Sequence, residues 1–133
     1  MSFTRRTMIT AAAFGAAFGL MAPAAQADTR AAWSGCATGE ICVYQELNGG
    51  GKPCHWDGED NDWENGNITC SWAGPNMHAK SIWNRGTGSV SAVKFYKFAY
   101  FNDFYACAAK GFKGNTGPDA GVHIQSHKWA TSC

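Results

Sequence analysis

Residues 41–51 read ICVYQELNGGG and residues 93–103 read VKFYKFAYFND, and these two stretches reveal an internal repeat. Each begins with four residues of similar apolar pattern that end in tyrosine, with Lys94 as the one charged residue in the second, and a cysteine follows each, Cys54 in the first and Cys107 in the second. The first copy then contains an insertion, between Cys54 and Cys70, that has no counterpart in the second copy.

The two halves also end alike. The phrase MHAKS at 77–81 matches VHIQS at 122–126, and a tryptophan follows each phrase, Trp83 in the first half and Trp129 in the second. Because these features recur in the same order, we interpret the chain as two copies of one unit. Chance similarity is the alternative.

The spacing of apolar runs predicts strands. After residue 28 there is no amphipathic helical stretch, and glycine interrupts the chain at short intervals. Between the glycines lie short runs rich in β-branched and aromatic residues, at 41–44, 81–83, 90–98 and 122–124. Short strands separated by turn residues are typical of an all-β sandwich.

The repeat has a motif at its centre: two aromatic residues, a glycine at a tight bend and a later serine. In the first unit Tyr44, Gly51 and Ser81 occupy three of these positions, and Gly49 stands where the second aromatic belongs. The bend requires a positive φ, which glycine adopts without cost. The serine is expected to hydrogen-bond to the backbone of the bend.

The second unit retains both aromatics of the motif, Tyr96 and Phe101, and its serine, Ser126. Asp103 stands where the glycine belongs, and aspartate is among the better substitutes at a positive φ. This pattern resembles the Greek-key motif of the βγ-crystallins. The resemblance implies two Greek keys that form one βγ-crystallin-like sandwich.

The N-terminus is typical of an export signal. Arg5 and Arg6 precede an apolar stretch at 8–22, and the small-residue pattern Ala-Gln-Ala at 25–27 predicts cleavage after Ala27. We therefore expect a signal peptide over 1–27 that directs export by either the general secretion pathway or the twin-arginine pathway. A single secreted domain is expected over 28–133, with its units at 28–88 and 89–133.

Six cysteines in a short exported chain predict a disulfide framework. A zinc site is the alternative, although no CxxC spacing occurs. Six cysteines allow several connectivities, and spacing ranks first the pairs Cys36–Cys42, Cys54–Cys70 and Cys107–Cys133.

Among βγ-crystallin-like proteins, the chain is most similar to secreted actinobacterial proteins of peptidase inhibitor family I36. The resemblance rests on the Cys36-x5-Cys42 opening, the bend at 49–51, the run at 80–84 and the second unit. It implies a non-catalytic inhibitor of extracellular peptidases, of the metalloprotease type. The chain departs from the pattern of the family's inhibitors at one point: Cys107 has no closely spaced cysteine partner to clamp a contact loop.

Charge and residue clusters exclude several other functions. Without Arg5 and Arg6 the chain has one more acidic than basic residue, which favours neither nucleic acid nor a membrane as partner. The positions where this fold binds calcium, 76–81 and 121–126, lack paired carboxylates. No nucleophile elbow or metal-ligand motif occurs. We expect a monomer with no catalytic residue, metal or cofactor.

The insertion gives a second hypothesis. Trp56, Trp63 and Trp72 lie in or beside it, close to acidic and amide side chains. Exposed aromatic rings commonly mark binding sites, so the alternative function is a secreted binding or toxin-like module whose three tryptophans dock a carbohydrate, a cell wall or another cell surface. The alternative is that they fill the core of a small domain. The acidic run at 57–64 is expected to be a solvated loop rather than a cation site.

Overall fold

The computed structural model describes residues 31–66, 68–76 and 78–133. The predicted signal peptide at 1–27 lies outside the described residues. Among those described, no helix is long and apolar enough to cross a membrane.

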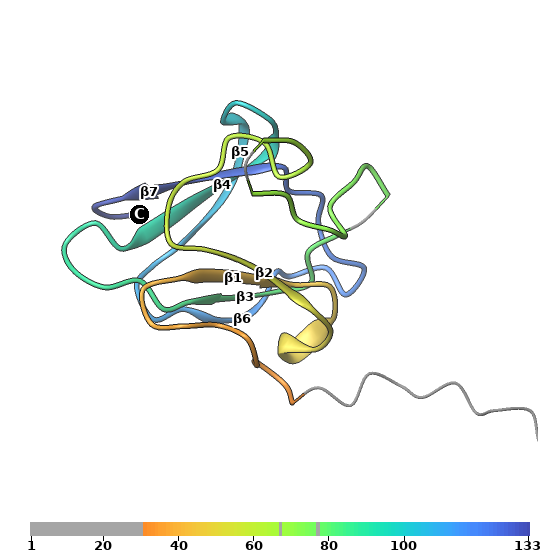
Figure 1. The fold of residues 1–133 in the computed structure, drawn as a ribbon, viewed down its shortest axis with the longest axis horizontal. Coiled ribbons are helices and arrows are strands. Elements are labelled where there is room, and N and C mark those ends of the chain that lie inside the picture. The colour runs from red at the N-terminus through yellow and green to blue at the C-terminus, as the bar shows by residue number, and fades with distance from the viewer. Residues whose placement is uncertain (1–30, 67, 77) are drawn as a thin grey trace, which may run out of the picture.

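Two antiparallel sheets face each other, as the layers in Figure 1 show. The four-stranded sheet has the order β2-β1-β3-β6, with β1 at Ile41–Tyr44, β2 at Pro53–Trp56, β3 at Ser81–Asn84 and β6 at Lys113–Asn115. The three-stranded sheet has the order β5-β4-β7, with β4 at Ala92–Phe98, β5 at Asn102–Ala108 and β7 at Ser126–Ala130. A single 3-10 turn, η1 at Leu47–Gly49, joins β1 to β2 in the described chain. The predicted all-β Greek-key fold is confirmed.

The two units exchange strands. β6 belongs to the second unit but pairs with β3 of the first, and Asp60 of the first unit forms a bridge with His127 on β7. Between the sheets, Ile41 and Val43 on β1 join the same buried cluster as Phe95 on β4. Each unit therefore completes the other's sheet, and both share one core.

The motif serines bind the two hairpin bends in the same way. The Ser81 hydroxyl donates to the Glu46 carbonyl at 2.6 Å and accepts from the Gly49 amide at 2.8 Å. The Ser126 hydroxyl donates to the Phe98 carbonyl at 2.6 Å and accepts from the Phe101 amide at 3.1 Å. Each hydroxyl thus satisfies two backbone groups that a folded-over hairpin leaves unpaired.

The aromatic residue that the first motif lacks comes from elsewhere in the chain. The Trp33 ring packs edge-on against Tyr44 with centroids 5.4 Å apart, much as Phe101 packs against Tyr96 at 5.7 Å. The Trp33 amide donates to the Gly49 carbonyl at 2.8 Å, and a Cβ on Gly49 would overlap the indole ring. Glycine at position 49 therefore makes room for the substitute ring.

Three disulfides fasten the domain. They join Cys36–Cys42, Cys54–Cys70 and Cys107–Cys133, the pairs that spacing ranked first, and no free cysteine remains in the described chain. The second disulfide closes the insertion, and the third ties the C-terminal residue to β5. Bonds of this kind stabilise a small domain chiefly by restricting its unfolded chain.

Candidate functional site

The three tryptophans proposed for docking are buried. Trp56 is 2% exposed, Trp63 0% and Trp72 7%, so none presents a ring face to solvent. Their indole N–H groups donate to internal acceptors, which are the Asp60 carboxylate, His127 Nδ1 and the Lys52 carbonyl. This burial favours the alternative that the rings fill the core, and it leaves them no exposed face for docking a carbohydrate or a cell surface. All three belong to the main core cluster, together with Ile41, Val43 and Phe95.

The acidic residues of the insertion bond to their own loop. One Asp60 oxygen accepts from the Asp62 amide at 2.9 Å, and Asp62 accepts from the Glu64 amide and the Gln125 side chain, each at 3.1 Å. Burial alone would raise the pKa of Asp62, but hydrogen bonds from Asn65, Gln125 and the backbone outweigh it and lower the pKa. These carboxylates shape the loop.

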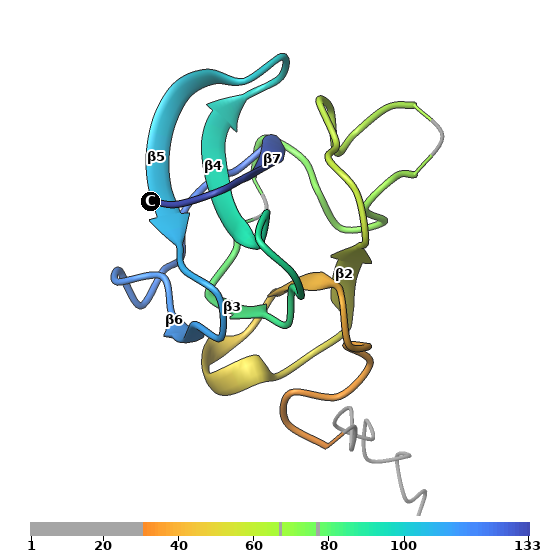
Figure 2. The ribbon, with the colours of Figure 1, turned by 90° about the vertical axis from the view of Figure 1, so that its left-hand side faces the viewer.

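A surface that the sequence analysis did not identify lies on the hairpin between β4 and β5. Phe98 is 50% exposed, Tyr100 74% and Phe104 56%. We call residues 98–104 the aromatic hairpin; it projects at one end of the molecule (Figure 2). The available signal was the number of rings in this stretch, because the Greek-key motif accounts for only Tyr96 and Phe101.

The aromatic hairpin is held in one conformation. Its bend places Tyr100, Phe101 and Asp103 at positive φ, between +58° and +59°. Left-handed backbone at bulky residues costs free energy and persists only where surrounding contacts impose it. Here the contacts are the two bonds to Ser126 and a 2.7 Å bond from the Tyr100 amide to the Asn61 carbonyl. The exposed rings are therefore presented on a preorganised support.

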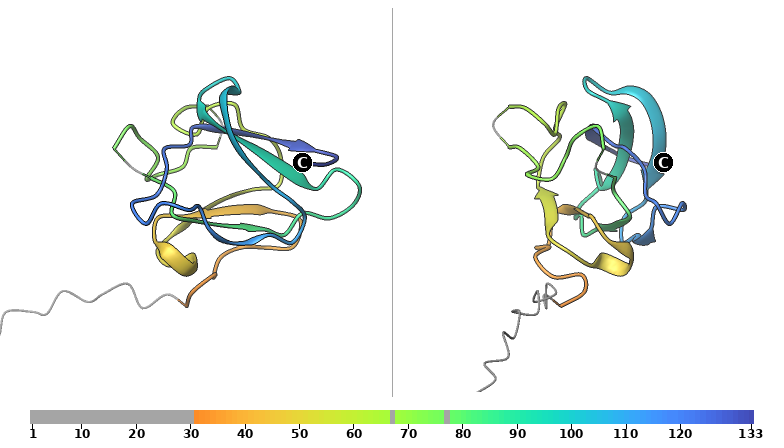
Figure 3. Two further views of the ribbon diagram at one scale, coloured as in Figure 1. Left: turned by 180° about the vertical axis from the view of Figure 1, so that it is seen from behind. Right: turned by 90° about the vertical axis from the view of Figure 1, so that its right-hand side faces the viewer.

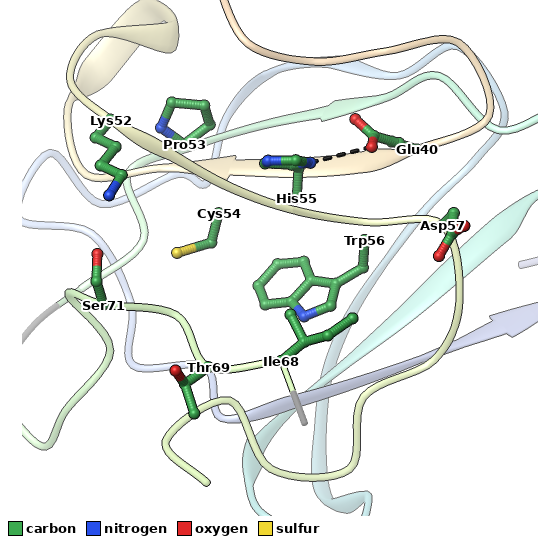
Figure 4. Close-up of a pocket in the computed structure, with 10 residues that line it drawn as sticks. All are labelled: Glu40, Lys52, Pro53, Cys54, His55, Trp56, Asp57, Ile68, Thr69 and Ser71. Atoms are coloured by element: carbon green, nitrogen blue, oxygen red, sulfur yellow. Dashed lines mark hydrogen bonds and ion pairs between the residues drawn. The ribbon is translucent and has the colours of Figure 1, made fainter. Parts of the chain in front are cut away.

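Two open hollows flank the insertion. One, of about 430 Å³, lies beside the aromatic hairpin and is lined by Glu59, Asn61, Asn65 and Phe101 among others. The other, of about 420 Å³, runs along β2. Figure 4 shows the His55–Glu40 pair at its upper wall, with Ser71 and Thr69 on the opposite wall. The His55 Nδ1 atom lies 3.0 Å from the Glu40 carboxylate.

His127 is a fully buried titratable side chain with a large pKa change. Burial lowers the pKa of His127 to about 4, although a hydrogen bond to the Gly58 carbonyl opposes the shift. Trp63 donates to Nδ1 at 2.9 Å, which leaves the ring proton on Nε2, 2.9 Å from the Gly58 oxygen. The neutral imidazole thus accepts one bond and donates the other, and holds the insertion at both points.

Among the described residues, the one cluster of metal-ligand side chains with suitable spacing is Cys36, Glu40 and Cys42, and its two sulfurs form a disulfide. At the first calcium-like phrase, the Lys80 ammonium lies 3.2 Å from the Glu46 carboxylate and places a positive charge there.

The chain is similar to known proteins in its family and in its fold. The sequence model of peptidase inhibitor family I36 matches residues 29–108. A solved structure from work on the evolution of the eye-lens βγ-crystallin domain fold is similar, with a TM-score of 0.53 and 22% identity, over 71% of this chain and 88% of that one. This likeness concerns the fold. A search of curated proteins gave no match.

Proposed function

The chain belongs to peptidase inhibitor family I36, and we propose from this that it is an extracellular inhibitor of metallopeptidases that binds its target through the aromatic hairpin. The family match over residues 29–108 carries the proposal. Membership implies a non-catalytic protein with a peptidase as partner. The metallopeptidase target, export and the contact surface are our inferences.

The chemistry of the aromatic hairpin supports its role as the contact surface. Tyrosine and phenylalanine provide large contact areas and are enriched at the centres of protein interfaces. A preorganised loop loses little conformational entropy on binding, so more of its contact energy appears as affinity. Tyr100 combines the greatest exposure of any large apolar side chain in the described chain with a backbone amide fixed to Asn61.

Export is supported by the disulfides. Three disulfides persist in oxidising surroundings, and they fit a protein that works outside the cell. We propose that residues 1–27 are removed and that 28–133 form the active domain. Mass spectrometry of the exported protein should find Asp28 at its N-terminus; a different first residue would refute the cleavage site.

A titration tests the inhibitory function. The oxidised protein is titrated against a thermolysin-like metallopeptidase and, for comparison, a serine peptidase, with a chromogenic peptide as substrate. We expect stoichiometric inhibition of the metallopeptidase at micromolar concentration or below. Cleavage of the protein with no loss of peptidase activity would refute inhibition.

Two matched alanine variants locate the contact surface. Tyr100→Ala should raise the inhibition constant about 30-fold, which corresponds to about 2 kcal/mol at an interface hot spot. Phe112→Ala removes a ring that is 42% exposed outside the aromatic hairpin, and should leave the constant unchanged. Equal effects of the two variants would exclude the aromatic hairpin as the contact surface.

A further inference from the structure

The aromatic hairpin contains no cysteine, and the nearby Cys107 on β5 pairs with Cys133 rather than across the hairpin. Its tip instead contacts the insertion of the other unit. The Tyr100 amide donates to the Asn61 carbonyl at 2.7 Å, and Asn61 lines the hollow beside Phe101. Figure 3 shows the insertion and the hairpin at the same end of the molecule, and the bond establishes that they touch.

Asn61 lies between two anchored residues. Asp60 exchanges two backbone hydrogen bonds with His127, at 3.1 and 2.9 Å. Trp63 bonds to β7 through its side chain, with Nε1 2.9 Å from His127 Nδ1, and its amide lies 2.8 Å from the carbonyl of Gln125, the residue just before β7. The chain at Asn61 is therefore fixed on both sides to the strand that also carries Ser126.

The far end of the insertion is fastened as well. The Cys70 amide donates to the Trp63 carbonyl at 2.8 Å, and Cys70 is linked to Cys54 on β2. The Trp63 ring stacks on Trp56 with centroids 4.6 Å apart and is fully buried. A continuous set of contacts thus runs from β2 through Cys70 and Trp63 to Asn61 and the hairpin tip.

From these contacts we infer that the insertion is a brace which positions the aromatic hairpin for binding, with Trp63 as its central positioning residue. The role in binding rests on the proposed function, whereas the bracing itself is a property of the free protein. A fastened support lowers the entropy that the hairpin loses when it meets a partner. The brace therefore acts on affinity without touching the target.

Two tryptophan-to-phenylalanine variants test the brace. Trp63→Phe keeps an aromatic ring but removes the N–H that bonds to His127. Trp72→Phe, the matched control, removes the N–H of another buried tryptophan, which bonds to the Lys52 carbonyl at 3.0 Å. Trp63→Phe should raise the inhibition constant about tenfold, the size expected when a contact loop must be reordered on binding. The control should keep the wild-type constant.

Amide hydrogen exchange distinguishes local loosening of the hairpin from a general loss of stability. In Trp63→Phe the Tyr100 amide should exchange at least about tenfold faster at constant global stability, and in Trp72→Phe it should not change. An unchanged Tyr100 amide in folded Trp63→Phe, or the same acceleration in both variants, would overturn the brace.

Wild-type exchange keeps the proposal testable if Trp63→Phe does not fold. The amides of Tyr100, Trp63 and His127 should then exchange through one shared opening as denaturant is added. Exchange of Tyr100 through a smaller opening, with the other two still protected, would contradict the brace. Failure of the wild-type protein to inhibit any peptidase would instead refute the proposed function, and the exchange data would still decide the bracing.

Discussion

The two hairpin bends of this molecule have the same backbone but different side chains. Equivalent positions in the two repeats adopt positive φ, with values of +56°, +72° and +76° in the first bend and +59°, +58° and +58° in the second. In chain order these residues are Asn48, Gly49 and Gly51 in the first bend, and Tyr100, Phe101 and Asp103 in the second.

The two bends differ in steric strain and in the function that the strain suggests. Two of the three positions in the first bend are glycines, which adopt a positive φ without steric penalty. The second bend has no glycine and must be held by its contacts. Strain that is retained in this way is commonly associated with function. The comparison therefore favours the second bend as the one that presents side chains to a partner.

The residues that follow the two motif serines also differ, one being apolar and the other polar. In the first unit Ile82 follows the motif serine on β3, whereas in the second unit His127 follows it on β7. Both are buried, but only His127 forms hydrogen bonds to the insertion. The first bend is thus backed by an apolar contact and the second by a polar network. Four sets of substitutions test this contrast.

The largest effect is expected at Gly49. Gly49→Ala places a Cβ inside the Trp33 ring and imposes a positive φ on alanine, and the two penalties together should lower the free energy of unfolding by about 4 kcal/mol. Gly88→Ala is the control, because it has φ +80° with no atom near the added Cβ, and should cost about 1 kcal/mol. Urea unfolding of both variants measures the difference. Equal losses would mean that Trp33 is not packed on the first bend.

The next largest effect is the dependence of folding stability on pH that His127 causes. Its pKa is lowered to about 4 in the folded protein, against an ordinary 6.5. Above pH 6.5 the side chain is neutral in both states and has no effect. Between 6.5 and 4 the unfolded chain binds a proton that the folded protein does not, so stability falls as the pH falls, by about 3 kcal/mol in total.

A neutral replacement checks the assignment of this effect. His127→Gln keeps a hydrogen-bonding side chain that does not titrate, so its stability should be flat between pH 6.5 and 4. Urea unfolding at several pH values measures the slope. A wild-type slope in His127→Gln would assign the acid sensitivity to other groups. Carboxylates whose pKa is lowered, such as Asp62, act at lower pH.

Removal of the two motif serines separates stability from binding. Ser81→Ala and Ser126→Ala each leave one backbone N–H and one carbonyl without a partner, and each should cost about 2 kcal/mol of unfolding free energy. Only Ser126→Ala should also weaken peptidase inhibition, by about tenfold, because it loosens the aromatic hairpin. If Ser81→Ala weakens inhibition equally, the two bends do not differ in function.

Local patterns in the sequence were sufficient to predict much of the fold. The motif positions Tyr44, Gly51 and Ser81 were identified because each side chain has a fixed role in one bend. The all-β class followed from glycine spacing and short apolar runs. The cysteine pairs could be ranked because short loops limit which sulfurs meet.

Contacts between distant residues could not be predicted in this way. The Trp63–His127 bond joins residues 64 apart in the sequence, and the burial of Trp63 depends on the fold that this bond helps to complete. Trp33 replaces the missing aromatic from outside the motif, so no spacing within the motif could indicate it. Exposure of Tyr100 also depends on tertiary packing, because buried and exposed rings are alike in sequence.

The smallest predicted effect concerns the glycine position of each bend. Asp103→Gly relieves a positive φ but loses an exposed ion pair with Lys97, which contributes little, so the variant should be more stable by about 0.5 kcal/mol. The reciprocal change, Gly51→Asp, should cost about 1 kcal/mol. Urea unfolding of the two variants compares the bends directly. Because the aromatic side chains stay in place, Asp103→Gly should inhibit as the wild type does. A stabilised variant with weaker inhibition would show that Asp103 itself contacts the peptidase.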